Sequence, residues 1–329
     1  MSLILDEEQV AADATADDTY RGLIERLSRQ SVDKHFDAYA DVAWDDPAMQ
    51  IDPADPRWEL WDDDPVGKTQ WYKSLPQPQR AHIGLHRVVT AMKIGVQFES
   101  VLKRGLLDYA TTLPNNSPEF RYLYHEVIEE AQHSLMFQEF VNRSGFDPPG
   151  LPWDMRLGAR FVVHLARWFP PLFFMFVLGG EDPIDYTQRR ALRSGHENHP
   201  LLERIMRIHV TEEARHLSFA RHYLRHEVPK LGRVRRAILA LATPRLLGEM
   251  AQQMLLPSAD LLKEHGMTKR RLNEEVGMDE AQQFVKDSVG KVRRLCVELG
   301  LVGPVAKRLW KGVGLWDEPV APKAPAAAA

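Results

Sequence analysis

The 329-residue sequence predicts an all-α fold, and two observations support this prediction. Apolar residues recur at helical spacing through several long segments, and no segment shows the strict apolar–polar alternation of a half-buried strand. One such apolar face, within residues 81–113, consists of Met92, Gly95, Val96, Leu102 and Leu106. In addition, two of the long segments each contain a string of the form Glu-x-x-His, in a position where it would lie on a helix.

Breaking residues divide the chain into successive helices. The expected helices span residues 19–30, 81–113, 117–144, 157–192, 199–227, 232–265 and 279–299. Ser117 and Pro118 are a typical N-cap and first helical residue, and Gly145 is a typical stop signal. Residues 43–79, rich in Asp, Pro and Trp, are expected to wrap irregularly over the core.

A single domain is expected at residues 18–316, because candidate functional residues spread over 99–216 must converge in space. Residues 1–17 are acidic and Ala-rich, and residues 317–329 are Pro/Ala-rich. Segments of such composition bury too little apolar surface to fold, so both tails are expected to be disordered.

The composition excludes several classes of protein. The net charge of −4 gives no electrostatic case for a nucleic-acid partner. A single cysteine, Cys296, excludes an internal disulfide framework and cysteine-ligated zinc or iron–sulfur sites. It fits a reducing compartment, and the acidic start lacks a secretory signal, so a cytoplasmic location is expected. The most apolar run, residues 169–180, is shorter than the roughly 20 residues of a spanning helix. No transmembrane segment is expected; the run is interpreted as a buried core helix, with a membrane-surface contact as the alternative.

The two strings that share the Glu-x-x-His pattern are Glu130-Ala-Gln-His133 and Glu213-Ala-Arg-His216. A Glu and a His three residues apart on a helix project from the same face. Two such pairs, with one further Glu from each of two other helices, form the dinuclear carboxylate site of ferritin-like bundles. We therefore predict a ferritin-like four-helix bundle with additional flanking helices.

Two further candidate ligands lie on the helical faces that these strings define. Glu99 lies between Val96 and Leu102 on an apolar face, where an ionised carboxylate is costly unless it is paired or binds a metal. The alternative is a pairing with Lys103. His209 lies one turn before Glu213 and on the same face, so this helix offers three ligands.

The remaining helix, 157–192, offers Glu181, which follows the apolar run and is therefore expected to be buried. This helix is expected to be kinked or broken near Pro170-Pro171 and again at Gly179-Gly180 and Pro183. In the alternative interpretation, Asp182 is the N-cap of a new segment. Asp182 and Asp185 are rival ligands.

The other acidic and histidine residues are expected to support the site or to face solvent. Glu129 is interpreted as part of a solvated face, Glu126 as supporting or surface, and Glu212 as solvent-facing or supporting. The other histidine pairs lack a Glu three residues earlier and are interpreted as surface or supporting groups; they are His82/His86, His196/His199 and His222/His226.

The candidate ligands are four carboxylates and three imidazoles: Glu99, Glu130, His133, Glu181, His209, Glu213 and His216. Mixed oxygen and nitrogen ligation suits iron or manganese, whereas structural zinc favours four tetrahedral ligands that often include thiolates. Four carboxylates also largely offset the charge of two divalent cations. Both an iron pair and a manganese–iron pair remain open.

These residues resemble the diiron N-oxygenase family typified by p-aminobenzoate N-oxygenase of aureothin biosynthesis. The resemblance covers roughly residues 80–230 and rests on Glu99, Glu130-x-x-His133, Glu181 and His209-x-x-x-Glu213-x-x-His216. It implies a ferritin-like homodimer whose two iron ions are held by these seven residues. It further implies that the protein activates O2 with electrons from an external donor, a reductase or ferredoxin, and oxygenates an amine to the hydroxylamine and nitro levels.

The expected function is therefore that of an O2-dependent diiron monooxygenase acting on an aromatic or apolar amine. Phe173, Phe174, Phe176 and Val177 are candidates for an apolar lining of its substrate pocket, and a plain core is the alternative that would look the same. One alternative is a diiron hydroxylase or desaturase acting on C–H bonds. Two others are an iron-binding or ferroxidase protein without an organic substrate, and a helical bundle that binds no metal.

Overall fold

The computed structural model describes residues 7–61 and 64–316, and within these residues it contains helices and loops but no strand. The all-α prediction is confirmed. The first helix, α1 (Glu7–Asp33), begins inside the 1–17 segment that is expected to be disordered. Residues 1–6 and the expected Pro/Ala tail at 317–329 lie outside the described residues.

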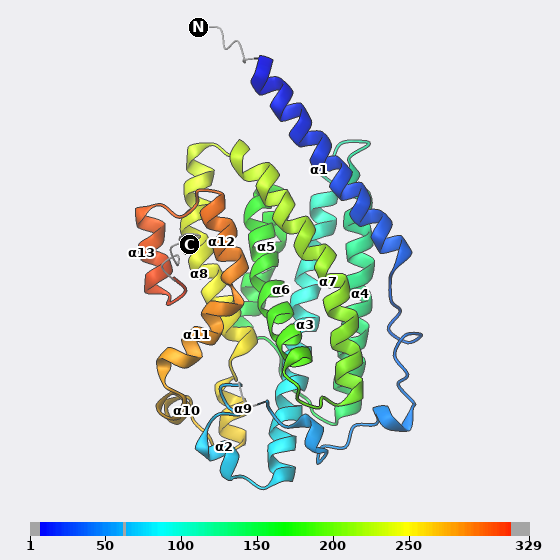
Figure 1. The fold of residues 1–329 in the computed structure, drawn as a ribbon, viewed down its shortest axis with the longest axis vertical. Helices are drawn as coiled ribbons and strands as arrows, with labels where there is room; N and C mark the ends of the chain where they lie inside the picture. Colours follow the sequence, from blue (N-terminus) through cyan, green and yellow to red (C-terminus); the bar gives the residue numbers. More distant parts are fainter. Residues whose placement is uncertain (1–6, 62–63, 317–329) are drawn as a thin grey trace, which may run out of the picture.

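Four long helices form the central bundle, as Figure 1 shows: α3 (Gln77–Ala110), α4 (Pro118–Ser144), α6 (Pro170–Arg193) and α7 (Pro200–Glu227). Helix α3 packs along α4, and α6 packs along α7. Contacts of α3 with α6 and of α4 with α7 close the bundle. Helix α5 (Trp153–Trp168) flanks α3 and α6, α1 lies across α4 and α7, and α8 (Arg233–Leu255) packs on α6. This is the ferritin-like arrangement with flanking helices that the sequence predicts.

Shorter elements complete the described chain. They are η1 (Pro47–Met49), η2 (Pro56–Trp58), α2 (Gln70–Ser74), η3 (Val228–Lys230), α9 (Ala259–Glu264), α10 (Lys269–Val276), α11 (Met278–Ser288), α12 (Gly290–Glu298) and α13 (Pro304–Gly312). The helix expected at 232–265 is therefore α8 followed by α9, and the one expected at 279–299 is α11 followed by α12. Residues 34–61 and 64–69 are largely irregular, and Trp44 and Trp58 among them are buried in the core.

The segment at 157–192, expected to be kinked or broken near Pro170-Pro171, is broken there into two helices. Helix α5 ends at Trp168 and α6 starts at Pro170, because proline cannot continue a helical hydrogen-bond ladder but suits the first helical position. Helix α6 then continues without interruption through Gly179, Gly180 and Pro183. Of the expected kink or break at these residues, the break is therefore wrong, and Asp182 is not an N-cap.

The two glycines of α6 allow neighbouring helices to approach closely. A Cβ atom on Gly180 would lie 2.0 Å from the ring of Phe98 on α3, and one on Gly179 would lie 3.0 Å from Leu247 on α8. Only glycine leaves room for such contacts, which explains why these residues occur inside a continuous helix. Close packing here brings α6 to the centre of the bundle.

Two apolar cores lie at the two ends of the bundle. Helix α3 contributes Leu85, Val89 and Met92 to one core and Leu102 and Leu106 to the other. The apolar residues of α4 and of α7 are likewise shared between the two cores, and buried polar residues form a layer between the cores. The apolar run of α6 is buried in this interior from Phe173 to Gly180. None of the described helices is both long and apolar enough to cross a membrane.

Candidate metal centre

The polar layer contains all seven residues that the sequence singles out. They come from all four bundle helices: Glu99 from α3, Glu130 and His133 from α4, Glu181 from α6, and His209, Glu213 and His216 from α7. None of the seven is more than 4% exposed. Buried charged groups at this density need compensating partners.

The seven residues form two adjacent groups. One group contains Glu99, His133 and His209, and the other contains Glu130, Glu181, Glu213 and His216; within each group, one ligand atom per residue lies within 4.8 Å of the others. Glu213 joins the groups, because its Oε1 lies 3.5 Å from His209 Nε2 and 3.8 Å from His133 Nδ1. The arrangement offers two neighbouring sites, as a dinuclear centre requires.

Many atoms of these groups have no hydrogen-bond partner although they are buried. They include both carboxylate oxygens of Glu130 and of Glu181, one oxygen each of Glu99 and Glu213, and Nδ1 of His133 and of His216. His216 Nδ1 lies only 2.9 Å from Glu130 Oε1, yet the two atoms are not aligned for a hydrogen bond. Buried polar atoms without partners are rare and costly. Carboxylate oxygens and imidazole nitrogens converging in this way fit a pair of divalent cations.

The electrostatics of the metal-free layer lead to the same interpretation. Burial, with the nearby charge of Glu130, raises the pKa of Glu99 to about 8. Burial, with Glu213 and Glu130, raises the pKa of Glu181 well above its ordinary value. Burial also opposes ionisation of Glu130, but contacts with His133 and His216 outweigh it and hold its pKa well below the ordinary value. Protons therefore offset much of the charge when metal is absent, and cations would displace them.

Two histidines are held by glutamates that cross between helices. Glu212 on α7 accepts a hydrogen bond from His133 Nε2 on α4 at 2.8 Å. Glu129 on α4 accepts one from His216 Nε2 on α7, also at 2.8 Å. In the neutral ring, a proton on Nε2 leaves the lone pair on Nδ1, toward the carboxylates of the layer. Orienting the ring in this way is the usual role of a group behind a metal-binding histidine.

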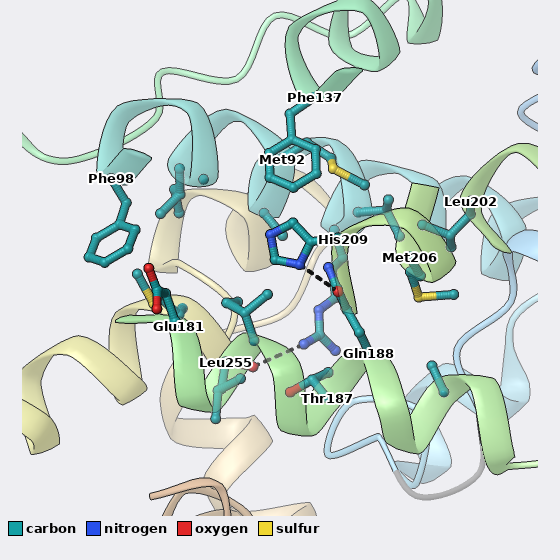
Figure 2. A pocket seen from close by; sticks show the side chains of 18 of the residues that line it. Met92, Phe98, Phe137, Glu181, Thr187, Gln188, Leu202, Met206, His209 and Leu255 are labelled. Carbon is teal, nitrogen blue, oxygen red and sulfur yellow. Dashed lines mark hydrogen bonds between the residues drawn. The ribbon is translucent and has the colours of Figure 1, made fainter. Parts of the chain in front are cut away.

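The third histidine uses the opposite ring nitrogen. His209 Nδ1 lies 2.9 Å from Gln188 Oε1, which can only accept, so this nitrogen carries the proton (Figure 2). The lone pair is then on Nε2, the atom that faces Glu213. Burial, with the charge of His133, lowers the pKa of His209 well below its ordinary value, which keeps the ring neutral and able to bind a metal.

The expectation that Glu129 faces solvent is wrong, and Glu212 is supporting rather than solvent-facing. Glu129 is 2% exposed and Glu212 is completely buried. Arg215 lies between them, with Nη2 at 2.8 Å from Glu129 Oε1 and 3.5 Å from Glu212 Oε1. The available signal was that each Glu-x-x-His string is preceded by a second glutamate. Adjacent helical residues diverge by about 100°, so the first glutamate reaches the neighbouring helix while the second faces the layer.

Other acidic residues near the centre have separate roles. Glu126 is 1% exposed and adjoins the layer, so of its two expected placements it takes the supporting one. The rival ligands on α6 are engaged elsewhere: Asp182 binds Arg221, and Asp185 binds Arg189 and Lys291. Neither aspartate belongs to the two candidate groups.

Replacing Glu129 or Glu212 with glutamine should weaken iron binding by about 10- to 100-fold, because the histidine loses its charged partner and its fixed tautomer. Iron titration of each variant would measure this change. Glu139→Gln is a matched control, since Glu139 is on α4 but pairs with Arg143 outside the layer. Affinities equal to that of the unmodified protein in both variants would contradict the proposed supporting role.

A cavity of about 170 Å³ opens onto the polar layer, with Glu99, Glu130, Glu181, His209 and Glu213 in its wall. Figure 2 shows Glu181 and His209 facing it together with Met92, Phe98, Phe137, Leu202 and Met206. The expected lining of Phe173, Phe174, Phe176 and Val177 is wrong: none of the four lines the cavity. These side chains pack into apolar clusters instead. Val177 and Phe174 share the face of Glu181 but lie one and two turns before it, beyond the polar layer.

Among the described residues that line the cavity, Arg87 is the one arginine or lysine. It forms a close ion pair with buried Asp64 and donates a hydrogen bond to the carbonyl of Leu255 at 3.1 Å. The polar part of the wall also includes Thr187, Asn198 and Gln188, the hydrogen-bond partner of His209. The cavity is therefore mainly apolar, and its arginine is already neutralised.

Comparisons with known proteins agree with this geometry. The family model described as P-aminobenzoate N-oxygenase AurF matches residues 17–300. The chain is 39% identical over 301 residues to the uncharacterized proteins MT0908 of Mycobacterium tuberculosis and Mb0909 of Mycobacterium bovis, covering 91% of this chain and 88% of each relative. No solved structure matches at a significant level. The matched residues include the whole four-helix bundle with its polar layer, and the chain therefore belongs to the p-aminobenzoate N-oxygenase AurF family.

Proposed function

We propose that this protein is an O2-dependent diiron monooxygenase that oxygenates the nitrogen of a small, apolar or aromatic amine. One observation supports the proposal above all: the unpartnered carboxylate and imidazole atoms border a mainly apolar cavity. A ferroxidase without an organic substrate has no use for such a cavity. Family membership supports the oxygenase class and leaves the substrate to be identified.

The proposed ligands are the seven residues of the two groups. Two iron ions held there would supply the binding and reductive activation of O2, with electrons from an external donor. The protein contributes the remaining parts of the reaction. Glu212, Glu129 and Gln188 would fix the histidine rings so that the opposite ring nitrogen of each faces the ions, and the apolar wall excludes water from the site.

The volume of the cavity limits the size of the substrate. A closed apolar cavity of roughly 150 Å³ in another protein accommodates benzene. A volume of about 170 Å³ therefore suits one ring or a short aliphatic group. Phe98 and Phe137 supply aromatic surface beside the metal groups, which favours a substrate with a ring.

The state of Arg87 argues for a substrate without a carboxylate. A carboxylate in the cavity would have to compete with Asp64, which is 3% exposed and already paired with this arginine. Displacing a buried partner from an ion pair is costly. We therefore propose an uncharged aniline-type amine in preference to an aminobenzoate.

For the test, the protein is loaded with iron under anaerobic conditions and reduced. It is then exposed to ¹⁸O2 in the presence of aniline, 4-aminobenzoate or toluene. About two irons per chain and ¹⁸O bound to the aniline nitrogen are expected, with at least about tenfold slower turnover of 4-aminobenzoate, as an unpaired buried charge predicts. Label on carbon would favour the C–H hydroxylase. Iron oxidation with no labelled organic product would favour the ferroxidase and overturn the proposal.

A further inference from the structure

A second cluster of metal-binding side chains lies away from the polar layer, between α3 and the end of α9. It consists of His86 on α3 and of Glu264 and His265 at the end of α9. His86 is 6% exposed, so of its two interpretations, as a surface or a supporting group, the surface one is wrong. These residues have no part in the function proposed above.

The distances within this cluster are close to those of a metal site. His86 Nδ1 and His265 Nε2 are 3.0 Å apart, and Glu264 Oε1 lies 3.8 Å from His86 Nδ1. All three ligand atoms lie within 4.8 Å of one another. Tetrahedral zinc with Zn–N bonds of 2.0–2.1 Å places two ligand nitrogens about 3.3 Å apart, so small side-chain rotations would suffice.

A hydrogen bond between the two imidazoles is the simpler explanation of the short contact, but it leaves other features without a role. It uses neither Glu264 nor His82, which lies one turn before His86 on α3. The His82 ring centroid is 5.7 Å from that of His265, within reach of a shared ion. A His-x-x-x-His pair facing another histidine and a carboxylate is a donor set that suits zinc.

The surroundings of His86 and His265 favour the neutral imidazole, the form that binds metals. Burial lowers the pKa of His86, and burial together with His86 lowers the pKa of His265 to about 4. The ring of Phe146 stacks on His86 with centroids 4.6 Å apart and forms an apolar wall behind it. On the other side, His82, Glu264 and His265 line a hollow in the protein surface through which a hydrated ion can enter.

We propose that His86, Glu264 and His265 bind one divalent ion of the zinc type, with His82 or water as the fourth ligand. The ion would connect α9 to α3. His86 is followed by Arg87, which binds the carbonyl of Leu255 at the end of α8 and lines the cavity. A metal here therefore anchors the α8–α9 connection next to the cavity wall.

The test is the number of zinc ions retained per chain after dialysis of metal-free protein against Zn²⁺. The proposed dinuclear centre should hold two zinc ions, and the unmodified protein should retain a third at the His86 cluster. His265→Gln should lose this third ion and keep the two in the bundle. His35→Gln is the matched control, because His35 is exposed and contacts the local carbonyl of Val32, away from the cluster. Equal zinc content in His265→Gln and the unmodified protein would overturn the proposal.

Two further variants separate this site from the centre proposed above. A Glu130→Ala/Glu213→Ala double variant should lose zinc from the bundle yet keep the ion that depends on His265. Glu264→Gln changes an exposed side chain and should leave folding intact while weakening zinc binding at this site at least about tenfold. If Glu264→Gln bound zinc with unchanged affinity and His265→Gln retained every zinc ion, the contact between His86 and His265 would be a hydrogen bond and not a metal site.

Discussion

Replacing Glu181 with leucine is expected to stabilise the metal-free protein by about 2 kcal/mol and to reduce its iron content at the same time. Glu181 is 4% exposed, and neither of its carboxylate oxygens has a hydrogen-bond partner. An apolar side chain removes that desolvation cost, but it also removes a proposed ligand. A residue retained for function at the expense of stability has this pair of opposite effects.

Denaturant unfolding of the metal-free protein and iron analysis after loading would measure the two effects of Glu181→Leu. The neighbouring Asp182→Leu is the matched control and should behave in the opposite way. It leaves Arg221 without its ion-pair partner and should cost about 3 kcal/mol, while the iron content stays the same. If Glu181→Leu destabilised the metal-free protein and kept full iron, Glu181 would have a structural role instead.

Replacing Arg215 with methionine is expected to destabilise the metal-free protein by about 3–5 kcal/mol. Arg215 is 7% exposed and is the cation that contacts both Glu129 and Glu212. Methionine keeps much of the side-chain volume but leaves two buried carboxylates with less compensation. Their histidine partners would become less firmly oriented as a consequence.

Gln132→Met is the control for Arg215→Met, because Gln132 occupies the same position in the other Glu-x-x-His string. Its side chain accepts a hydrogen bond from Ala38 N and contacts Asp37 near the surface, so its loss should cost about 1 kcal/mol. Urea unfolding of both variants, with Arg215→Lys as a partial rescue, provides the comparison. Equal losses for Arg215→Met and Gln132→Met would show that Arg215 does not hold the supporting carboxylates together.

The residues of the candidate centre are accessible from the sequence because their spacing is local. Glu130 with His133, and His209 with Glu213 and His216, share a face through the helical repeat alone. Glu99 stands out because it is a carboxylate on an otherwise apolar stripe. That the seven residues bind metal remains a prediction, whereas their convergence in one buried layer is a property of the fold.

The supporting residues could not be assigned from the sequence. Glu129 and Glu212 look like members of acidic surface faces until the rotation of α4 and α7 about their axes is known. The same is true of Phe173 and Phe174, which are apolar enough for a pocket but point into a core. Gly179 and Gly180 predict a break on local propensity, and tertiary packing overrides it because α3 and α8 approach α6 there.

By itself, the sequence determined most of the helices of the bundle and the grouping of the candidate metal ligands on their faces. These features follow from the repeat of a single helix and from residues such as Pro118 and Gly145 that start or stop it. Only the tertiary structure decided which partners lie behind the histidines, which side chains line the cavity, and that His86 meets His265. Such contacts join residues far apart in the chain, and they depend on how helices pack against one another, which no local spacing specifies.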